Sequence, residues 1–232
     1  MPGPDHRPAA VLWDFDGTLA DTEPSWFAAE FALAARHGAG WTDEDARALV
    51  GAELIESGRY IRERMDIDLR PEAIVALLLD QVEVDVRRGV TWRPGARALL
   101  AELRAAGVPC ALVTMSYTRL IDAALEQLPP DSFDVLVTGD AVAKGKPHPE
   151  AYLTAAARLG VDPAGCVAIE DSPAGAASAE AAGAHVLVVP HHVDVPAGPR
   201  RTHRASLEGV GLADLAALVR ERPVDREDVT ES

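Results

Sequence analysis

Five short apolar runs recur along the chain, and segments of helical character separate them. The runs are AAVLWD, VPCALVT, DVLVTG, CVAIED and HVLVVP. Continuous apolar strands that alternate with helices indicate a parallel sheet with helices on both faces. One intervening segment, RPGARALLAELRAAG, places three leucines on one buried stripe, between a proline at the helix start and a glycine at its end. The pattern therefore predicts an α/β fold.

Residues 22–90 interrupt this alternation, because they contain no convincing strand. Four amphipathic runs predict four helices: SWFAAEFALAARHG, with Ser25 as its cap, TDEDARALVG, ELIESGRYIRERM and PEAIVALLLDQVEVDVRR. Thr42 and Asp45 have the spacing of a capping box at the start of the second run. An insert of this length is too long for a loop, so it predicts a separate helical cap domain.

The cap divides the rest of the chain into two parts. We expect residues 8–21 and 91–222 to form one discontinuous sheet domain and residues 22–90 to form the cap, with junctions near residues 20–22 and 89–93. VPHHVDVPAGPRRTHRASLEG is expected to be a loop and LADLAALVRER a closing helix. Residues 223–232 are expected to be a disordered tail.

Composition limits the possible partners. The chain has 232 residues, of which 48% are hydrophobic, so it has ample material for a core. Its 22 basic and 37 acidic residues give a formal net charge of −15, which argues against nucleic acid or an acidic membrane surface as a partner. An anionic substrate would need a local cationic pocket. Nothing in the sequence demands a dimer, so a monomer is expected.

Targeting signals and reactive side chains add little to this picture. No stretch has the length and apolarity of a membrane span, and MPGPDHRPAA lacks the apolar core of a signal peptide, so a cytoplasmic protein is expected. Cys110 and Cys166 lie in apolar runs, which predicts two buried free thiols. His148, His191 and His192 lie in loops, where histidine is commonly a surface residue, and we expect no role for them.

Polar residues follow the ends of the predicted strands. In VLWDFDGTLADT, Asp14 and Asp16 lie on the same side of the extended chain. Like charges this close repel each other unless a cation or a shared proton offsets the repulsion. Three further pairs follow later strands: Thr114 and Ser116, Lys144 and Lys146, Glu170 and Asp171. Because parallel strands end at one edge of the sheet, where ligands bind in open α/β folds, these side chains should converge.

Each of these features also has a purely structural interpretation. An Asp-x-Asp-Gly run after a strand is common as a turn or cap, and Ser172 and Pro173 make an ordinary helix start. Lysines in loops are usually solvated. The structural interpretation must hold at four places along one sheet edge, so a shared site is favoured.

Four runs taken in order resemble one enzyme family. DFDGTLADT, VTMS, KGKPHPE and IEDSPAG resemble the successive motifs of haloacid dehalogenase-like hydrolases, and the inserted helices resemble the cap of the β-phosphoglucomutase and sugar-phosphatase branch. The resemblance covers about residues 10–190. It implies a Rossmann-like parallel-sheet core with an inserted α-helical cap domain.

The resemblance also implies a reaction and a metal. Asp14 would be the nucleophile that forms an aspartyl-phosphate, and Asp16 would act as acid and then as base. Mg²⁺ would be held by Asp14, the main-chain carbonyl of Asp16 and Asp171, with Glu170 supporting the site.

The remaining family positions would bind the phosphoryl group. Thr114 would hold a phosphoryl oxygen, with Ser116 close by, and Gly17 would allow the turn to bring its amides near the phosphate. The family lysine stands directly before Pro-x-Pro, which selects Lys146 over Lys144 as the cation that offsets the phosphoryl charge.

This scaffold supports several reactions and roles in the family. Asp16 favours phosphoryl transfer, because the family's dehalogenases lack an acid there and halide leaves without a proton. The branch's mutases carry a histidine where this chain has Trp26, basic residues near Val50 and Leu54, and a lysine near Tyr117. Their loss favours a phosphatase over a β-phosphoglucomutase-type mutase, which remains the alternative. A phosphate-binding regulatory relative is the non-enzyme alternative.

The first cap helix bears on the substrate. DTEPSW resembles a run in hexitol and deoxysugar phosphatases of this branch, which implies a small phosphorylated sugar or polyol as substrate. Glu23, Trp26 and Glu30 share one helical face and are candidates to overlook the site. Glu53 is a second candidate to bind substrate hydroxyls.

Overall fold

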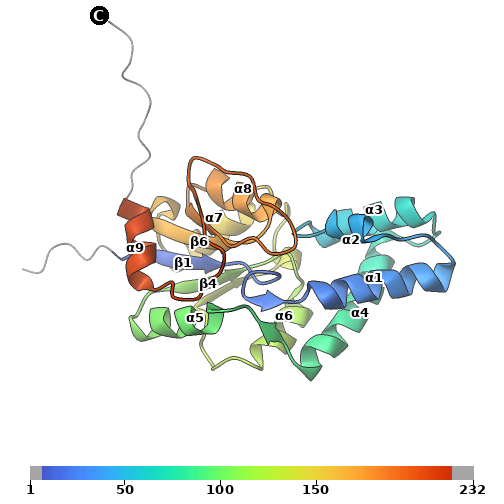
Figure 1. The fold of residues 1–232 in the computed structure, drawn as a ribbon, viewed down its shortest axis with the longest axis horizontal. Helices are drawn as coiled ribbons and strands as arrows, with labels where there is room; N and C mark the ends of the chain where they lie inside the picture. Colours follow the sequence, from blue (N-terminus) through green and yellow to red (C-terminus); the bar gives the residue numbers. More distant parts are fainter. Residues whose placement is uncertain (1–6, 221–232) are drawn as a thin grey trace, which may run out of the picture.

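The computed structural model describes residues 7–220, and its main element is a six-stranded parallel sheet (Figure 1). The strand order is β5-β4-β1-β6-β7-β8. Five strands coincide with the five apolar runs: β1 (Ala10–Trp13), β4 (Cys110–Val113), β5 (Val135–Val137), β6 (Cys166–Glu170) and β7 (His185–Val188). The predicted parallel sheet is confirmed.

The sixth strand corrects one prediction. β8 (Arg201–His203) lies in a segment that was expected to be a loop, and it pairs in parallel with β7, where Val188 lies opposite His203. An edge strand is held mainly by main-chain hydrogen bonds and needs no apolar run. The sequence Arg-Thr-His, whose side chains are partly exposed, therefore gave no strand signal.

Helices cover both faces of the sheet. The core helices are α5 (Ala96–Ala105), α6 (Thr118–Leu125), α7 (Glu150–Leu159), α8 (Pro173–Ala181) and α9 (Leu212–Arg220), with short 3-10 turns η1 (Gly139–Ala141) and η2 (Pro163–Gly165). Side chains of β1 alternate between two hydrophobic clusters. Val11 and Trp13 join the cluster of α5, α6 and α9, and Ala10 and Leu12 join that of α7 and α8. The alternation explains why the strands read as continuous apolar runs.

The four predicted cap helices are present between residues 22 and 90: α1 (Glu23–His37), α2 (Asp43–Arg47), α3 (Leu54–Met65) and α4 (Pro71–Arg88). The predicted Ser25 cap is wrong, because the cap position is Thr22, three residues earlier, and Pro24 lies in the first turn of α1. The capping box of Thr42 and Asp45 is confirmed. Figure 1 shows the four helices beside the end of the sheet toward which the β1 arrow points.

Two short strands join the cap to the sheet domain. β2 (Ala20–Asp21) and β3 (Thr91–Trp92) pair antiparallel, with Ala20 opposite Trp92 and Asp21 opposite Thr91. The sequence predicted junctions at these places and no strands, since two-residue strands leave no periodic pattern.

The long helix α4 also packs on the core. The Gln127 side chain donates to the Val86 carbonyl at 2.6 Å and accepts from the Val90 amide at 2.9 Å. Arg119 of α6 pairs with Asp80 and Glu83 of α4. The cap therefore contacts the core beyond its two connecting strands.

Cys110 and Cys166 are buried free thiols, as predicted. Within residues 7–220, no helix combines the length and apolarity that crossing a membrane requires.

Candidate active site

Three sequence-distant side chains and one main-chain carbonyl meet at the carboxyl edge of the sheet. Lys146 Nζ donates to Asp14 Oδ1 at 2.6 Å, to Glu170 Oε1 at 2.7 Å and to the Val113 carbonyl at 2.9 Å. Asp14, Lys146 and Glu170 are all buried. Lys144, the competing lysine, is exposed. The geometry therefore agrees with the selection of Lys146 from the sequence.

Burial and charge act in opposite directions on this cluster. Burial raises the pKa of Asp14 to about 7, although the neighbouring Lys146 ammonium lowers it. Burial also disfavours the charged form of Lys146, but the carboxylates of Asp14 and Glu170 outweigh it and hold its pKa above the ordinary value. A fixed positive charge therefore lies beside the Asp14 carboxylate.

Asp16 is held by four side-chain donors. Its Oδ1 accepts from Thr22 Oγ1 at 2.6 Å and from Trp26 Nε1 at 3.2 Å. Its Oδ2 accepts from Ser116 Oγ at 2.8 Å and from Thr114 Oγ1 at 3.1 Å. Thr114 and Ser116, which the sequence assigned to phosphate, therefore contact the second aspartate here. Two of the donors belong to the core and two to the start of the cap.

Gly17 is required for a reason that the sequence did not reveal. Its φ of +79° is a conformation that other residues rarely adopt, and a Cβ would lie 2.0 Å from Asp171 Oδ2 and 2.8 Å from Glu23 Oε1. Its own amide donates to the Ala20 carbonyl at 2.7 Å and so is already engaged within the turn.

Three carboxylates lie where a metal is expected. Each of Asp14, Glu170 and Asp171 offers one oxygen, and these atoms lie within 4.8 Å of one another. Asp171 Oδ1 accepts from Thr18 Oγ1 at 3.3 Å, while Asp171 Oδ2 is buried and has no hydrogen-bond partner among residues 7–220. Hard oxygen donors with one unpaired buried atom fit a divalent cation such as Mg²⁺.

Glu170 is fixed by neighbours that the sequence reasoning missed. Tyr152 Oη donates to Glu170 Oε1 at 2.5 Å, and Ser172 Oγ donates to Glu170 Oε2 at 3.3 Å. Ser172 was identified only as a helix cap, and it also fills that role, since it accepts from the Gly175 amide. Tyr152 lies in an ordinary amphipathic helix, and no local signal distinguishes its hydroxyl.

A cavity that is partly open to solvent lies between the cap and these residues. It is lined on the core side by Asp14, Asp16, Ser116 and Lys146, and on the cap side by Glu23, Trp26, Glu30, Leu49, Val50, Leu54 and Leu78. The cap approaches the core closely at Gly51, where a Cβ would lie 2.5 Å from Ser172 Oγ.

The four cap candidates differ in position. Glu23, Trp26 and Glu30 line the cavity, whereas Glu53 does not. Glu30 accepts a hydrogen bond from Trp41 Nε1 at 3.2 Å, and burial raises its pKa to about 8. Burial, followed by the charge of Asp16, raises the pKa of Glu23 well above its ordinary value. The cap side of the cavity is therefore apolar apart from two carboxyls, an indole and the hydroxyl of Ser57.

Comparison with known proteins agrees with the geometry. The family model of the haloacid dehalogenase-like hydrolases matches residues 8–183. Hexitol phosphatase A of Escherichia coli is 37% identical over 192 residues, which cover 82% of this chain and 87% of that protein. The phosphorylated carbohydrates phosphatase of Thermotoga maritima is 33% identical over 175 residues, covering 75% of this chain and 81% of that protein.

A solved structure shares the same architecture. CbbY from Rhodobacter sphaeroides, in complex with phosphate, superposes with a TM-score of 0.78 at 31% identity, covering 89% of this chain and 98% of that chain. The family match spans most of the chain and includes β1 and β6, the strands that Asp14 and Asp171 follow. The chain therefore belongs to the haloacid dehalogenase-like hydrolases, in the branch with a helical cap that includes the sugar phosphatases.

Proposed function

We propose that this protein is a Mg²⁺-dependent phosphatase that hydrolyses small phosphate monoesters through an aspartyl-phosphate on Asp14. The observation that carries the proposal is the contact of Asp14 with Lys146 at 2.6 Å, beneath a cavity that Asp16 also lines. A carboxylate nucleophile, a fixed cation and a second carboxylate are the groups that this chemistry needs.

In the first step, a carboxylate oxygen of Asp14 attacks phosphorus and the bond from phosphorus to the ester oxygen breaks. Asp16 gives its proton to the departing alkoxide. In the second step, water attacks the phosphorus of the aspartyl-phosphate while Asp16 takes a proton from that water. The bond from phosphorus to the Asp14 oxygen breaks, so the Asp14 carboxylate is restored and inorganic phosphate leaves. Each proton that Asp16 gives is thereby returned.

Groups on the core would offset the negative charge of Asp14 and of the phosphoryl group. Lys146 contacts Asp14 directly and would offset part of the charge on the phosphoryl oxygens. Mg²⁺, held by Asp14, the Asp16 main-chain carbonyl and Asp171 with Glu170 in support, would neutralise further charge. Thr114 and Ser116 would bind phosphoryl oxygens when Asp16 turns toward the leaving group.

The cavity and the names of the relatives support one class of substrate. Among the lining residues within 7–220, Lys146 is the only cation, so a second phosphate would find no partner in the cavity. The carboxyls of Glu23 and Glu30 can bind hydroxyl groups. Two relatives are named for hexitol and carbohydrate phosphates. We therefore propose sugar or polyol monophosphates as substrates.

Phosphate release from sugar, polyol, nucleotide and glycolate phosphates, with and without Mg²⁺, tests the proposal. The expected result is Mg²⁺-dependent release that Asp14→Asn abolishes without loss of helical structure. Near wild-type release by that variant would refute the nucleophile. β-Glucose 1-phosphate with a trace of its bisphosphate belongs in the same panel, because conversion to the 6-phosphate without phosphate release would indicate the mutase instead. Binding of phosphate without any turnover would indicate the regulatory relative.

A further inference from the structure

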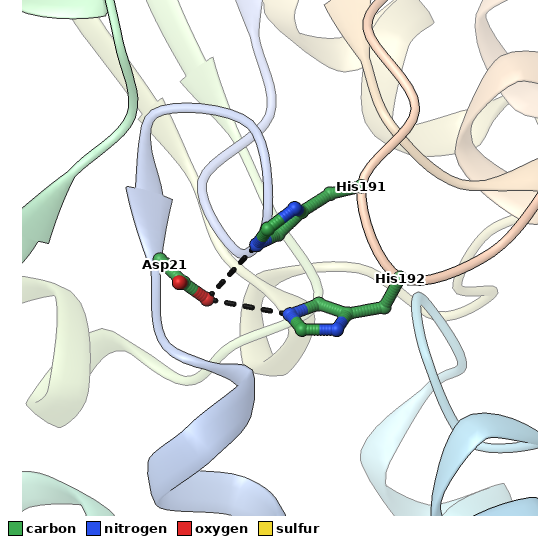
Figure 2. Close-up of side chains that lie close together, drawn as sticks. All are labelled: Asp21, His191 and His192. Carbon is green, nitrogen blue, oxygen red and sulfur yellow. Dashed lines mark hydrogen bonds and ion pairs between the residues drawn. The ribbon is translucent and has the colours of Figure 1, made fainter.

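Two histidines and an aspartate converge beside the junction of cap and core. Figure 2 shows His191 and His192, from the loop that follows β7, pointing toward Asp21 at the end of β2. Asp21 Oδ1 lies 3.2 Å from His191 Nε2 and 3.4 Å from His192 Nε2. The two rings are 3.9 Å apart between centroids. One carboxylate oxygen therefore faces two imidazole nitrogens.

His192 Nε2 is within hydrogen-bond distance of Asp21 Oδ1, whereas His191 Nε2 cannot satisfy both of its neighbours at once. His191 Nε2 lies 3.2 Å from Asp21 Oδ1, an acceptor, and 3.2 Å from a terminal guanidinium nitrogen of Arg93, a donor. If Nε2 carries a proton, it can donate to Asp21, but its N–H then faces a donor of Arg93. If Nε2 carries no proton, it can accept from Arg93, but its lone pair then faces the carboxylate oxygen of Asp21. Arg93 Nε is also buried without a hydrogen-bond partner among the described residues.

The spacing of the three donors suits a transition metal. In a tetrahedral Zn²⁺ site with bonds of about 2.0–2.1 Å, two ligand atoms lie about 3.3 Å apart. The two distances from Asp21 are close to that value, and all three donor atoms lie within 4.8 Å of one another. Imidazole nitrogens favour Zn²⁺ over Mg²⁺, which separates this cluster from the all-carboxylate site of Asp14 and Asp171.

The neighbourhood favours neutral imidazoles and permits access. Burial, then the charges of Arg93 and His192, lower the pKa of His191, so its ring is available as a neutral ligand at neutral pH. The side chains of the three residues are between 22% and 24% exposed. We propose that Asp21, His191 and His192 form a Zn²⁺ site, with the fourth position open to water.

A cation bound there would connect parts of the chain that move relative to each other when a cap opens. Asp21 belongs to the connecting strand β2, whereas both histidines belong to the core loop. His192 also packs edge-on against Phe27 and lies 4.0 Å from Glu23 Oε2, and both of these residues are in the first cap helix. Bound Zn²⁺ would therefore fasten the junction of cap and core.

Equilibrium dialysis of the whole chain against Zn²⁺, followed by metal analysis, tests the proposal. The buffer contains millimolar Mg²⁺ to occupy the carboxylate site. The wild type should retain one Zn²⁺ per chain, and the His191→Gln/His192→Gln variant should bind at least about 100-fold more weakly. Arg93→Gln should bind more tightly, because it removes a positive charge and a competing donor. These measurements do not depend on the proposed phosphatase activity.

Controls separate this site from adventitious binding. His148→Gln removes an exposed histidine elsewhere and should retain the metal. Circular dichroism checks whether the double variant folds. If it does not, Asp21→Asn, which keeps the shape of the cluster, replaces it as the test variant. Amide exchange at residues 20–22 and 89–93 should slow on addition of Zn²⁺ in the wild type alone. No retained Zn²⁺, or equal retention by the wild type and Asp21→Asn, would overturn the proposal.

Discussion

The indole Nε1 of Trp26 donates to Asp16 Oδ1 at 3.2 Å, so the first cap helix contacts the second aspartate of the motif directly. Trp26→Phe keeps an aromatic ring, and it removes this donor together with part of the volume of the indole. We expect kcat to fall about 13- to 160-fold, which corresponds to about 1.5–3 kcal/mol for a hydrogen bond to a charged group. Steady-state kinetics on the best substrate measure the effect.

The matched control is Trp41→Phe, because Trp41 donates to Glu30 and not to Asp16. It should change KM more than kcat. Equal kcat in Trp26→Phe and the wild type would mean that the contact with Asp16 plays no part in turnover.

The buried ion cluster makes Lys146 sensitive to substitution. Lys146→Met leaves Asp14 and Glu170 buried without their cation, so we expect loss of turnover and a loss of about 3–5 kcal/mol in the free energy of unfolding. Lys144→Met, at an exposed position two residues away, should change the unfolding free energy by less than about 0.5 kcal/mol and leave kcat unchanged. Urea unfolding and steady-state kinetics on the two variants measure these effects. A larger loss of activity and stability in Lys144→Met than in Lys146→Met would assign the functional role to Lys144.

The unpaired oxygen of Asp171 predicts how metal dependence responds to substitution. Asp171→Asn keeps the acceptor for Thr18 but removes one buried negative charge, so the fold should persist. We expect activity at saturating Mg²⁺ to fall at least about 100-fold and the Mg²⁺ concentration for half-activity to rise. Chelation should silence the wild type, and restored Mg²⁺ should recover it. A variant with unchanged Mg²⁺ titration would show that the metal lies elsewhere.

Glu30 predicts a pH dependence of stability. Burial raises its pKa to about 8, above the ordinary 4.5, so the folded state binds a proton that the unfolded state releases between these values. The stabilisation of the folded state by this protonation is therefore fully present below pH 4.5 and is lost as the pH rises through about 8. Glu30→Gln mimics the protonated form at both pH values. The free energy of unfolding of this variant relative to that of the wild type should therefore rise by on the order of 2–4 kcal/mol from pH 5 to pH 8.5.

Urea unfolding at both pH values measures this gain. Glu63→Gln, at an exposed position on another cap helix, is the control and should show a difference that does not change with pH. A pH-independent difference for Glu30→Gln as well would mean that Glu30 is ionised in the folded state.

The elements that could be predicted from the sequence are those with a strong local signal. β1 and β6 were predictable because residues buried on both faces give continuous apolar runs. The convergence of Asp14, Lys146 and Asp171 was predictable because parallel strands end at one edge of a sheet.

What could not be predicted depends on contacts between distant segments. β8 has no apolar run, and its pairing with β7 is made by the main chain. The bonds from Thr114 and Ser116 to Asp16, and from Tyr152 to Glu170, depend on side-chain orientation after folding. The His191 and His192 pair lies about 170 residues from Asp21 in the chain, and no local pattern links them.

The pairing of β2 with β3 means that the cap is topologically the loop of a β-hairpin. Since Ala20 and Trp92 lie side by side, the chain leaves and re-enters the sheet domain at a single point. A two-residue Asn-Gly turn could close the same hairpin in place of residues 22–90. Recombination at this point can therefore exchange one cap for another without changing the path of the chain through the sheet.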